Sequence, residues 1–574
     1  MSFRPTIMGT RHMIASGHYH ASIAGFEILE AGGNAVDAGV CAGMVLAVVE
    51  STYVSLAGVA PIAIYLADER RVMTISGLGG WPKAASCDLF VQRHGGVIPR
   101  GILRTVVPAA PDAWITALQK FGTMAFCDVA EAAIRFAQHG FPMYPFMAAT
   151  IAGSAREIGE WPSNAAIYLP GGAPPQLGLP FVQTALAGTL RHMCDEERAN
   201  ARLGREGALD AVRDCFYKGD IARAILDFHG ANGGLLAATD LSEFHVAIEP
   251  AVRRRFHDVD VYSCGAWCQG PMLLQQLAIL EHVDLRALGH NTPGYVHMVT
   301  EAIKLAAADR EAYYGDPRFV DVPLDRLLSP AYATERLRLI DVHHAFSDLP
   351  PAANPSGRTA ENTANEGRAG ERQPVNLDTS YVCVVDRFGN AFSATPSDPV
   401  TSAPVVPQTG FVVSPRGGQS WTDRKHPSSV MPGKRPRLTP NPAIAIHQGK
   451  FIMPFGTPGH DSQTQVMLQT LLNIVMFDME LQDAVEAARF CSLSFPSSAS
   501  PHHSHPGRLL LETPIFRDAG EALENLGHRV EEWPATGPEY YQNASASCAV
   551  QLDLATGVLK GGADHRRPAY VVGW

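Results

Sequence analysis

The sequence predicts an α+β protein in which helices dominate the first part of the chain and strands dominate the second. Apolar residues at helical spacing fill much of residues 110–345. Short strand-like runs separated by turn signals follow residue 379. The chain has 574 residues, 46% of them hydrophobic, so it is long enough to bury a large core.

The charge and the cysteines narrow the class of protein. The 57 acidic and 46 basic residues give a net charge of −11, which argues against binding along a nucleic-acid backbone. No apolar run approaches 18 residues, and the first 20 residues lack the apolar core of a secretory signal, so we expect neither a membrane span nor secretion. Ten cysteines without a CxxC pair fit a reducing compartment, and we expect a cytoplasmic protein.

The first elements can be placed from local signals. Residues 21–51 predict two helices, which Gly32 and Gly33 separate, with Asn34 or a neighbour capping the second. This second helix is apolar nearly all round and rich in Ala and Gly, so we expect it to be buried with close-packed neighbours. Strands are predicted at residues 59–66 and 72–75, and further helices at residues 129–138, 273–282 and 295–314.

A change of character follows near residue 351. Residues 351–374 contain no Val, Ile, Leu, Met, Phe, Tyr, Trp or Cys, which predicts an exposed, mobile linker extending to residue 378. Residues 379–386 and 391–395 then read as two strands joined by a hairpin turn. Strands at 443–446, 451–453 and 549–554, with a helix at 464–477, complete the prediction. A mobile linker that ends at a buried strand suggests a chain that cuts itself there.

Thr379 stands at this junction. A threonine hydroxyl is a poor nucleophile, but an N-terminal threonine carries its own base, an α-amino group with a pKa of about 7.7–8. That amine exists only if the bond between Asp378 and Thr379 is cut. The alternative is that Thr379 is an ordinary β-branched strand residue.

Several motifs in one order resemble the gamma-glutamyltranspeptidase family of N-terminal nucleophile hydrolases. The blocks are GGNAVDA at 32–38, TSYVCVVDRFGNA at 379–391, GKRP at 433–436, GTPGHD at 456–461, AVEAARF at 484–490 and GADHRRPAYVVGW at 562–574. In the family, the first threonine of the second block is both the self-processing residue and the nucleophile. The resemblance therefore implies this role for Thr379.

The resemblance also implies an architecture. We expect the four-layer αββα sandwich of N-terminal nucleophile hydrolases, with cleavage into a large fragment, 1–378, and a small one, 379–574. Neither fragment is expected to have a core of its own, so both should stay associated in one interlocked domain, with a dimer of such heterodimers as a further expectation. The family implies a small-molecule substrate and no metal or organic cofactor.

Other site residues carry over from the family motifs. The pair whose backbone N–H groups form the oxyanion hole falls on Gly459 and His460, and the hydroxyl that holds the nucleophile falls on Ser397. His460 replaces a glycine, which costs strain if the position needs a positive φ; the alternative is a loop histidine facing solvent. The alternative for Ser397 is a turn serine.

The substrate-binding positions depart from those of the glutathione-cleaving members. Residues 76–83 lack the arginine that holds the glutamyl carboxylate there, and Leu438 and Thr439 replace two adjacent serines. The stretch that should supply an acid for the substrate ammonium, residues 415–419, has none. We therefore expect a substrate that lacks the glutamyl α-amino group or presents it to solvent.

Arg416 places a positive charge in the stretch where the glutathione-cleaving members have an acid. Its guanidinium suits a substrate carboxylate; the alternative is a surface arginine beside Trp421. We predict substrate binding by Arg416, Thr439 and Asn441. The run of residues 438–442 is similar to the oxamate amidohydrolase-type branch, and the replacements as a set resemble amidohydrolases and cephalosporin acylases of the family.

The sequence thus predicts a self-processing amidohydrolase acting on a small carboxylate-bearing amide. One alternative is glutamyl transfer or hydrolysis on glutathione-like substrates, and another is an unprocessed binding protein. Three weaker signals are set aside. The histidines at 502, 503 and 505 predict a solvated loop rather than a metal site, residues 77–79 lack the third glycine of a dinucleotide site, and Cys383 is predicted to be core.

Overall fold

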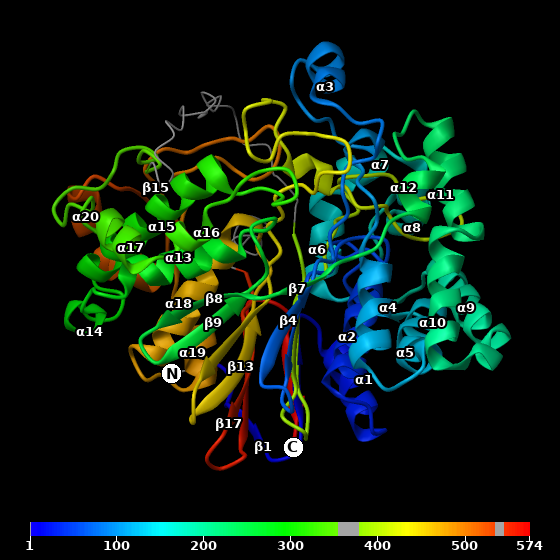
Figure 1. The fold of residues 1–574 in the computed structure, drawn as a ribbon, viewed down its shortest axis with the longest axis horizontal. Helices are drawn as coiled ribbons and strands as arrows, with labels where there is room; N and C mark the ends of the chain where they lie inside the picture. The colour runs from blue at the N-terminus through cyan, green and yellow to red at the C-terminus, as the bar shows by residue number, and fades with distance from the viewer. Residues whose placement is uncertain (1, 354–377, 534–544) are drawn as a thin grey trace.

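A computed structural model describes residues 2–353, 378–533 and 545–574. Two seven-stranded sheets lie face to face at its centre, with helices on both outer sides (Figure 1). This is the expected αββα sandwich, so the predicted fold class is confirmed. The predicted linker at 351–374 falls, from residue 354 on, outside the described residues.

Both sheets are antiparallel throughout. Sheet 1 has the strand order β1 (Ile7–Gly9), β18 (Leu559–Ala563), β17 (Cys548–Asp553), β13 (Phe451–Gly456), β12 (Ala443–His447), β9 (Val259–Ser263) and β8 (Val252–Phe256). Sheet 2 has the order β19 (Tyr570–Gly573), β2 (Met13–Ser16), β10 (Val382–Val385), β11 (Ala391–Ala394), β3 (Ile62–Leu66), β4 (Arg71–Ile75) and β7 (Ile248–Pro250). Both sheets therefore contain strands from before and from after residue 379.

The layer between the sheets is apolar. Cys383 and Val385 of β10, and Tyr381 just before this strand, pack there with residues such as Ile444 and Val550 of sheet 1. Because side chains alternate along a strand, Val382 and Val384 of β10 point the other way, toward the helices. Cys383 is therefore a core residue, as predicted. All ten cysteines are free.

The helices on the sheet 2 side begin with α1 (Tyr19–Glu30) and α2 (Ala35–Val49). Asn34 caps α2 as predicted, since its side chain accepts hydrogen bonds from the backbone N–H groups of Val36 and Asp37. Outside these two lie α4 (Ala110–Phe121), α5 (Phe126–His139), α9 (Thr184–Ala199) and α10 (Gly204–Tyr217).

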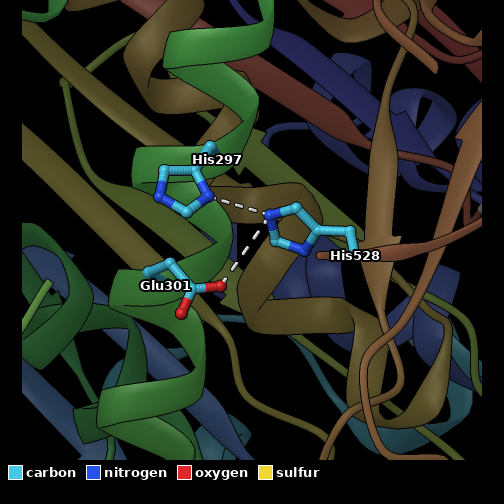
Figure 2. Close-up of side chains that lie close together, drawn as sticks. All are labelled: His297, Glu301 and His528. Carbon is cyan, nitrogen blue, oxygen red and sulfur yellow. Dashed lines mark hydrogen bonds and ion pairs between the residues drawn. The ribbon is translucent and has the colours of Figure 1, made fainter. Parts of the chain in front are cut away.

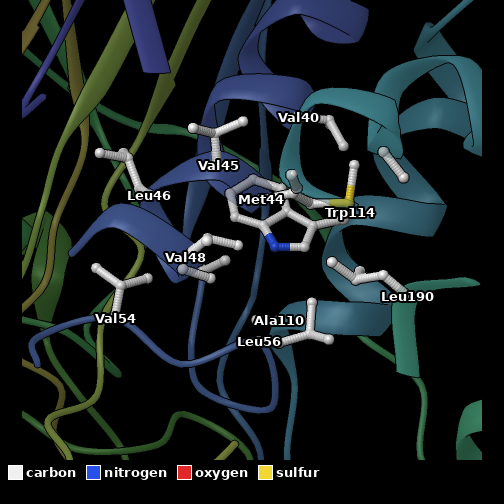
Figure 3. Packing of buried hydrophobic residues seen from close by; sticks show 14 of the residues in the cluster. Val40, Met44, Val45, Leu46, Val48, Val54, Leu56, Ala110, Trp114 and Leu190 are labelled. Carbon is white, nitrogen blue, oxygen red and sulfur yellow. The ribbon is translucent and has the colours of Figure 1, made fainter. Parts of the chain in front are cut away.

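Close packing of α2 explains its small residues. A Cβ on Gly39 would lie 2.2 Å from the Phe392 ring of β11, and one on Gly43 would lie 2.7 Å from the Trp114 ring of α4. Figure 3 shows that ring among Val40, Met44 and Val48 of α2. The helix is thus held between the sheet and a second helix layer, as its all-round apolar character predicts.

The helices on the sheet 1 side are α13 (Gly270–Leu280), α15 (Pro293–Tyr313), α18 (Gln463–Val475) and α19 (Leu481–Glu486). A small sheet of β14 (Phe490–Ser492), β15 (Arg508–Glu512) and β16 (Arg529–Trp533) extends this layer, and β5 (Phe141–Pro142) pairs with β6 (Pro180–Phe181) on the other side. The remaining helices are α3 (Cys87–His94), α6 (Pro145–Gly153), α7 (Ala155–Gly159), α8 (Pro162–Tyr168), α11 (Asp220–Ala231), α12 (Ala238–Ser242), α14 (Leu285–Leu288), α16 (Leu324–Leu327), α17 (Pro330–Leu337) and α20 (Thr513–Asn525). Within the described ranges, no helix has the length and apolar character needed to span a membrane.

Candidate active site

Thr379 lies just before β10, an interior strand of sheet 2. The regular strand β10 begins at Val382, three residues later than predicted, and Thr379 instead forms an isolated bridge with Ser397, just beyond β11. Both side chains are buried, and their hydroxyl oxygens are 3.0 Å apart. The structure therefore brings together the two hydroxyls that the family motifs pair.

The Asp378 carbonyl, on the bond that self-cleavage would cut, receives two donors. The Ser397 hydroxyl donates to it at 2.7 Å, and Arg416 Nη2 donates at 3.4 Å. The Ser397 side chain is fully buried. Thr379 Oγ1, Ser397 Oγ and this carbonyl form one connected cluster.

Arg416 is fully buried, and the alternative of a surface arginine is wrong. It lies in a short 3₁₀ helix, Arg416–Gln419, where its Nε donates to the Asp398 carboxylate at 2.5 Å. Its Nη2 also donates to Ser397 Oγ, and its Nη1 lies 3.5 Å from Thr439 Oγ1. In the uncut chain, Arg416 thus faces protein groups at positions where the sequence suggests a substrate carboxylate.

Asp398 is the member of this cluster that sequence reasoning missed. Its φ of +120° is rare for a residue with a side chain, and its backbone N–H donates to the Tyr53 carbonyl at 2.8 Å. Burial raises the pKa of the Asp398 carboxyl, whereas the adjacent Arg416 opposes this shift. An acid directly after Ser397, followed by proline, is the sequence signal that could have identified it.

Asp378 itself is held by a second arginine. Its carboxylate accepts a hydrogen bond from Arg567 Nη2 at 2.6 Å and another from the backbone N–H of Thr379 at 2.8 Å. Burial raises the pKa of Asp378, and Arg567 works against that shift. Arg567 also lies over the rings of Tyr53 and Phe146. Sequence analysis placed it only in a closing motif, with no role.

The turn that carries Gly459 and His460 precedes α18. Both residues have positive φ, +118° and +57°, so the strain expected for a histidine at this position is present. His460 is buried, which makes the solvent-facing alternative wrong. Gln463, at the start of α18, donates to Thr379 Oγ1 at 3.5 Å and so places this turn beside the candidate nucleophile.

Charged and amide groups fix that turn. His460 Nδ1 lies 2.8 Å from the Asp461 carboxylate, which also accepts from Arg310 at 2.7 Å. Although burial opposes ionisation, His460 and Arg310 hold the pKa of Asp461 well below its usual range. The backbone carbonyl of His460 accepts from Gln269 Nε2 at 2.8 Å.

Thr439 and Asn441 occupy different places relative to the cluster. Thr439 Oγ1 accepts from Gln419 Nε2 at 2.8 Å and lies near Arg416. Asn441 is linked to Thr379 through Gln463: the backbone N–H of Asn441 donates to Gln463 Oε1 at 3.3 Å, and Gln463 donates to Thr379. Its side-chain Oδ1 is buried and accepts no hydrogen bond from the described residues.

A buried acid close to Thr379 supports a prediction about pH. Burial raises the pKa of Glu50 from 4.5 to about 7, although the nearby Ser380 hydroxyl and Arg567 guanidinium favour the charged form. The folded state therefore retains this proton where the unfolded state loses it, and stability falls as the pH rises toward 7. We expect Glu50→Gln in a Thr379→Ala background to raise the melting temperature more at pH 8 than at pH 5.

The matched control for this prediction is Glu480→Gln, which removes an exposed carboxylate that pairs with Lys560. It should change the melting temperature little at either pH. An equal gain for Glu50→Gln at pH 5 and pH 8 would contradict a Glu50 that ionises with difficulty in the fold.

Two histidine groups bear on metal binding. His297, Glu301 and His528 converge in Figure 2, with His297 Nδ1 2.9 Å from His528 Nε2. Glu301, however, already pairs with the Lys304 ammonium at 2.7 Å, so this set is neutralised and hydrogen-bonded within itself. His502 stacks on Trp421 with ring centroids 3.8 Å apart, so the predicted solvated loop is wrong for that residue.

Comparison with known proteins extends these findings. The family model described as Gamma-glutamyltranspeptidase matches residues 21–574. The chain is 32% identical over 542 residues to the Acylase ACY 1 proenzyme of Pseudomonas sp. (strain V22), covering 92% of this chain and 88% of that protein. It is 29% identical over 572 residues to the Glutathione hydrolase-like YwrD proenzyme of Bacillus subtilis (strain 168), covering 99% of both. The crystal structure of cephalosporin acylase from Bacillus halodurans shares its fold, with a TM-score of 0.84, 24% identity and coverage of 100% and 98%.

Proposed function

Because the chain belongs to the gamma-glutamyltranspeptidase family of autoprocessed hydrolases, we propose that it cuts its own bond between Asp378 and Thr379 and then acts as an N-terminal threonine amidohydrolase. The observation that carries this proposal is the contact of Thr379 Oγ1 with Ser397 Oγ, which in turn donates to the Asp378 carbonyl. Both relatives described above are proenzymes, which supports a cut in this chain.

Self-cleavage exchanges one bond for another. Thr379 Oγ1 attacks the carbonyl carbon of Asp378, the bond to the Thr379 nitrogen breaks, and an ester replaces the amide while that nitrogen gains a proton. Water then hydrolyses the ester, which leaves a carboxylate on Asp378 and returns the hydroxyl to Thr379. The products are fragments of 378 and 196 residues, the smaller with a free α-amine.

Turnover uses the new amine. With a pKa of about 7.7–8, it accepts the Thr379 hydroxyl proton as the oxygen attacks a substrate amide. The backbone N–H groups of Gly459 and His460 stabilise the oxyanion, and water releases the acyl group. The ion pairs of Asp461 with His460 and Arg310 hold this turn in place during the reaction.

The substrate class follows from the charges near Thr379. Asp398 supplies a carboxylate, but Arg416 neutralises it, so it offers no partner to a glutamyl ammonium. Two buried guanidinium groups lie nearby: Arg416 donates to the Asp378 carbonyl, and Arg567 donates to the Asp378 carboxylate and the Thr379 carbonyl. We therefore propose that the substrate is the amide of a small carboxylic diacid without an α-amino group.

A substrate comparison tests this proposal. The purified, self-cut protein is given γ-glutamyl anilide and the matching glutaryl anilide, which differ only in the α-amino group. We expect kcat/KM for the glutaryl compound to exceed that for the glutamyl compound by about tenfold or more, since a buried ammonium without a partner costs at least 1–3 kcal/mol. A preference for the glutamyl compound would instead favour the second candidate function.

That second candidate is glutathione hydrolysis or glutamyl transfer. The full-length similarity to a glutathione hydrolase-like protein favours it. Release of glutamyl product, faster in the presence of an amino-acid acceptor, would support transfer.

A third possibility is an unprocessed binding protein. It is tested by a denaturing gel after long incubation: a single full-length band would support it, and two bands would reject it.

A further inference from the structure

We propose that Arg416 is a catalytic residue of the self-cleavage step, and that with Ser397 it forms an oxyanion site distinct from the one at Gly459 and His460. This inference rests on the proposed function, because it concerns how the same bond is cut. It assigns Arg416 first to the protein's own carbonyl rather than to a substrate carboxylate.

Ser397 Oγ takes part in three hydrogen bonds, and the donor in each of them can be identified. A serine hydroxyl has one proton to donate and two lone pairs to accept with. Arg416 Nη2 donates to one lone pair, and the Ser397 proton is directed to the Asp378 carbonyl at 2.7 Å. In the 3.0 Å hydrogen bond between Thr379 Oγ1 and Ser397 Oγ, the Thr379 hydroxyl must therefore be the donor, and the second lone pair of Ser397 accepts. Arg416 therefore orients the attacking hydroxyl through Ser397.

The same arrangement provides a route for the proton. As Thr379 Oγ1 bonds to the Asp378 carbon, negative charge develops on the carbonyl oxygen, where the hydrogen bonds from Ser397 and Arg416 stabilise it. The Thr379 proton moves to Ser397 Oγ, and the Ser397 proton then follows to the carbonyl oxygen as the intermediate forms. When the intermediate collapses, the carbonyl re-forms, the carbon–nitrogen bond breaks and that proton goes to the Thr379 nitrogen. The uncut chain has no α-amine at this point, and this relay needs none.

Arg416 supplies the charge that this step requires. Its guanidinium is fully buried, so water does not screen its interaction with the developing oxyanion. The Nε edge is held by Asp398, which leaves Nη2 directed at the carbonyl at 3.4 Å. The strained backbone of Asp398, at φ +120°, is explained by this requirement.

The inference separates two activities that share Thr379. Ser397 and Arg416 would stabilise the oxyanion of self-cleavage, and the amides of Gly459 and His460 that of turnover. The rate of self-cleavage is therefore the readout for Arg416, because turnover would also report the substrate contact proposed for this residue.

The test is a time course of self-cleavage in full-length variants, followed by denaturing gel and intact mass. We expect Arg416→Gln to slow formation of the 378- and 196-residue fragments by about 100-fold, the usual cost of an oxyanion donor. Arg416→Ala should be slow as well, and added guanidinium ion should restore part of its rate. The matched control is Arg104→Gln. Arg104 is a buried arginine next to the same 3₁₀ helix, and its side chain donates to the backbone carbonyls of Ile98 and Pro99.

Two results would overturn the inference. One is self-cleavage by folded Arg416→Gln within about twofold of the wild-type rate. The other is equal slowing in Arg104→Gln without guanidinium rescue of Arg416→Ala, which would mark a purely structural effect. Neither result would contradict the proposed function. That function would be contradicted if Thr379→Ala still produced a fragment beginning at residue 379.

Discussion

Replacing Thr379 by alanine should leave the protein as a single chain of 574 residues without amidohydrolase activity. The alanine has no oxygen to attack the Asp378 carbonyl, so neither the ester nor the free amine can form. Loss of a nucleophile typically lowers kcat by about 10⁴-fold or more, and here the uncut chain also keeps residue 379 buried. Intact mass spectrometry reports the cut, and amide turnover reports the activity.

Thr379→Ser is the matched control, because it retains the hydroxyl and removes only a methyl group. We expect it to cut itself and to hydrolyse substrate, both more slowly than the wild type. N-terminal sequencing of the wild-type small fragment should begin Thr-Ser-Tyr-Val. Normal cleavage in Thr379→Ala, or a fragment beginning elsewhere, would mean that the scissile bond has been wrongly assigned.

Replacing Gly459 by alanine should reduce turnover far more than self-cleavage. A Cβ at this position would lie 1.9 Å from Ser545 Oγ and 2.5 Å from Ser462 Oγ, and the φ of +118° is itself unfavourable for alanine. The turn must move, and with it the backbone N–H groups proposed to hold the substrate oxyanion. Loss of one such donor costs about 10²–10³-fold in kcat. Self-cleavage is measured on the same samples by gel.

Gly449→Ala controls for the strain alone. Gly449 also has a positive φ, +77°, but an added Cβ there meets nothing within 4 Å. We expect a modest loss of thermal stability and normal turnover. If Gly459→Ala turns over substrate at the wild-type rate, the oxyanion donors lie elsewhere. If it blocks self-cleavage and turnover alike, the two steps share one oxyanion site.

Much of the fold could be predicted from local patterns. The two-helix start around Asn34, the hairpin of β10 and β11, and the buried helix α15 all follow signals that act over a few residues. The pairing of strands could not be derived in this way. Nothing near Met13–Ser16 in the sequence indicates that this strand lies between β10 and β19, because that order is set by contacts across hundreds of residues.

The candidate site could likewise be predicted only in part from the sequence. Thr379 and Ser397 could be predicted because the family motif carries them, and the structure places them together. The surface alternative for Arg416 failed because the sequence did not reveal its partner Asp398. Arg567 was missed as a partner of Asp378 for a similar reason: 189 residues separate them, and only the fold brings their charges to 2.6 Å.

Each sheet combines strands from before and after residue 379, and this has a consequence for the reversibility of unfolding. Before the cut, the polypeptide folds as one molecule, and its yield does not depend on concentration. After the cut, two chains must find each other before either sheet can close, so refolding becomes a second-order process that weakens on dilution. The mature protein is then protected by the slowness of its unfolding rather than by any ability to re-form.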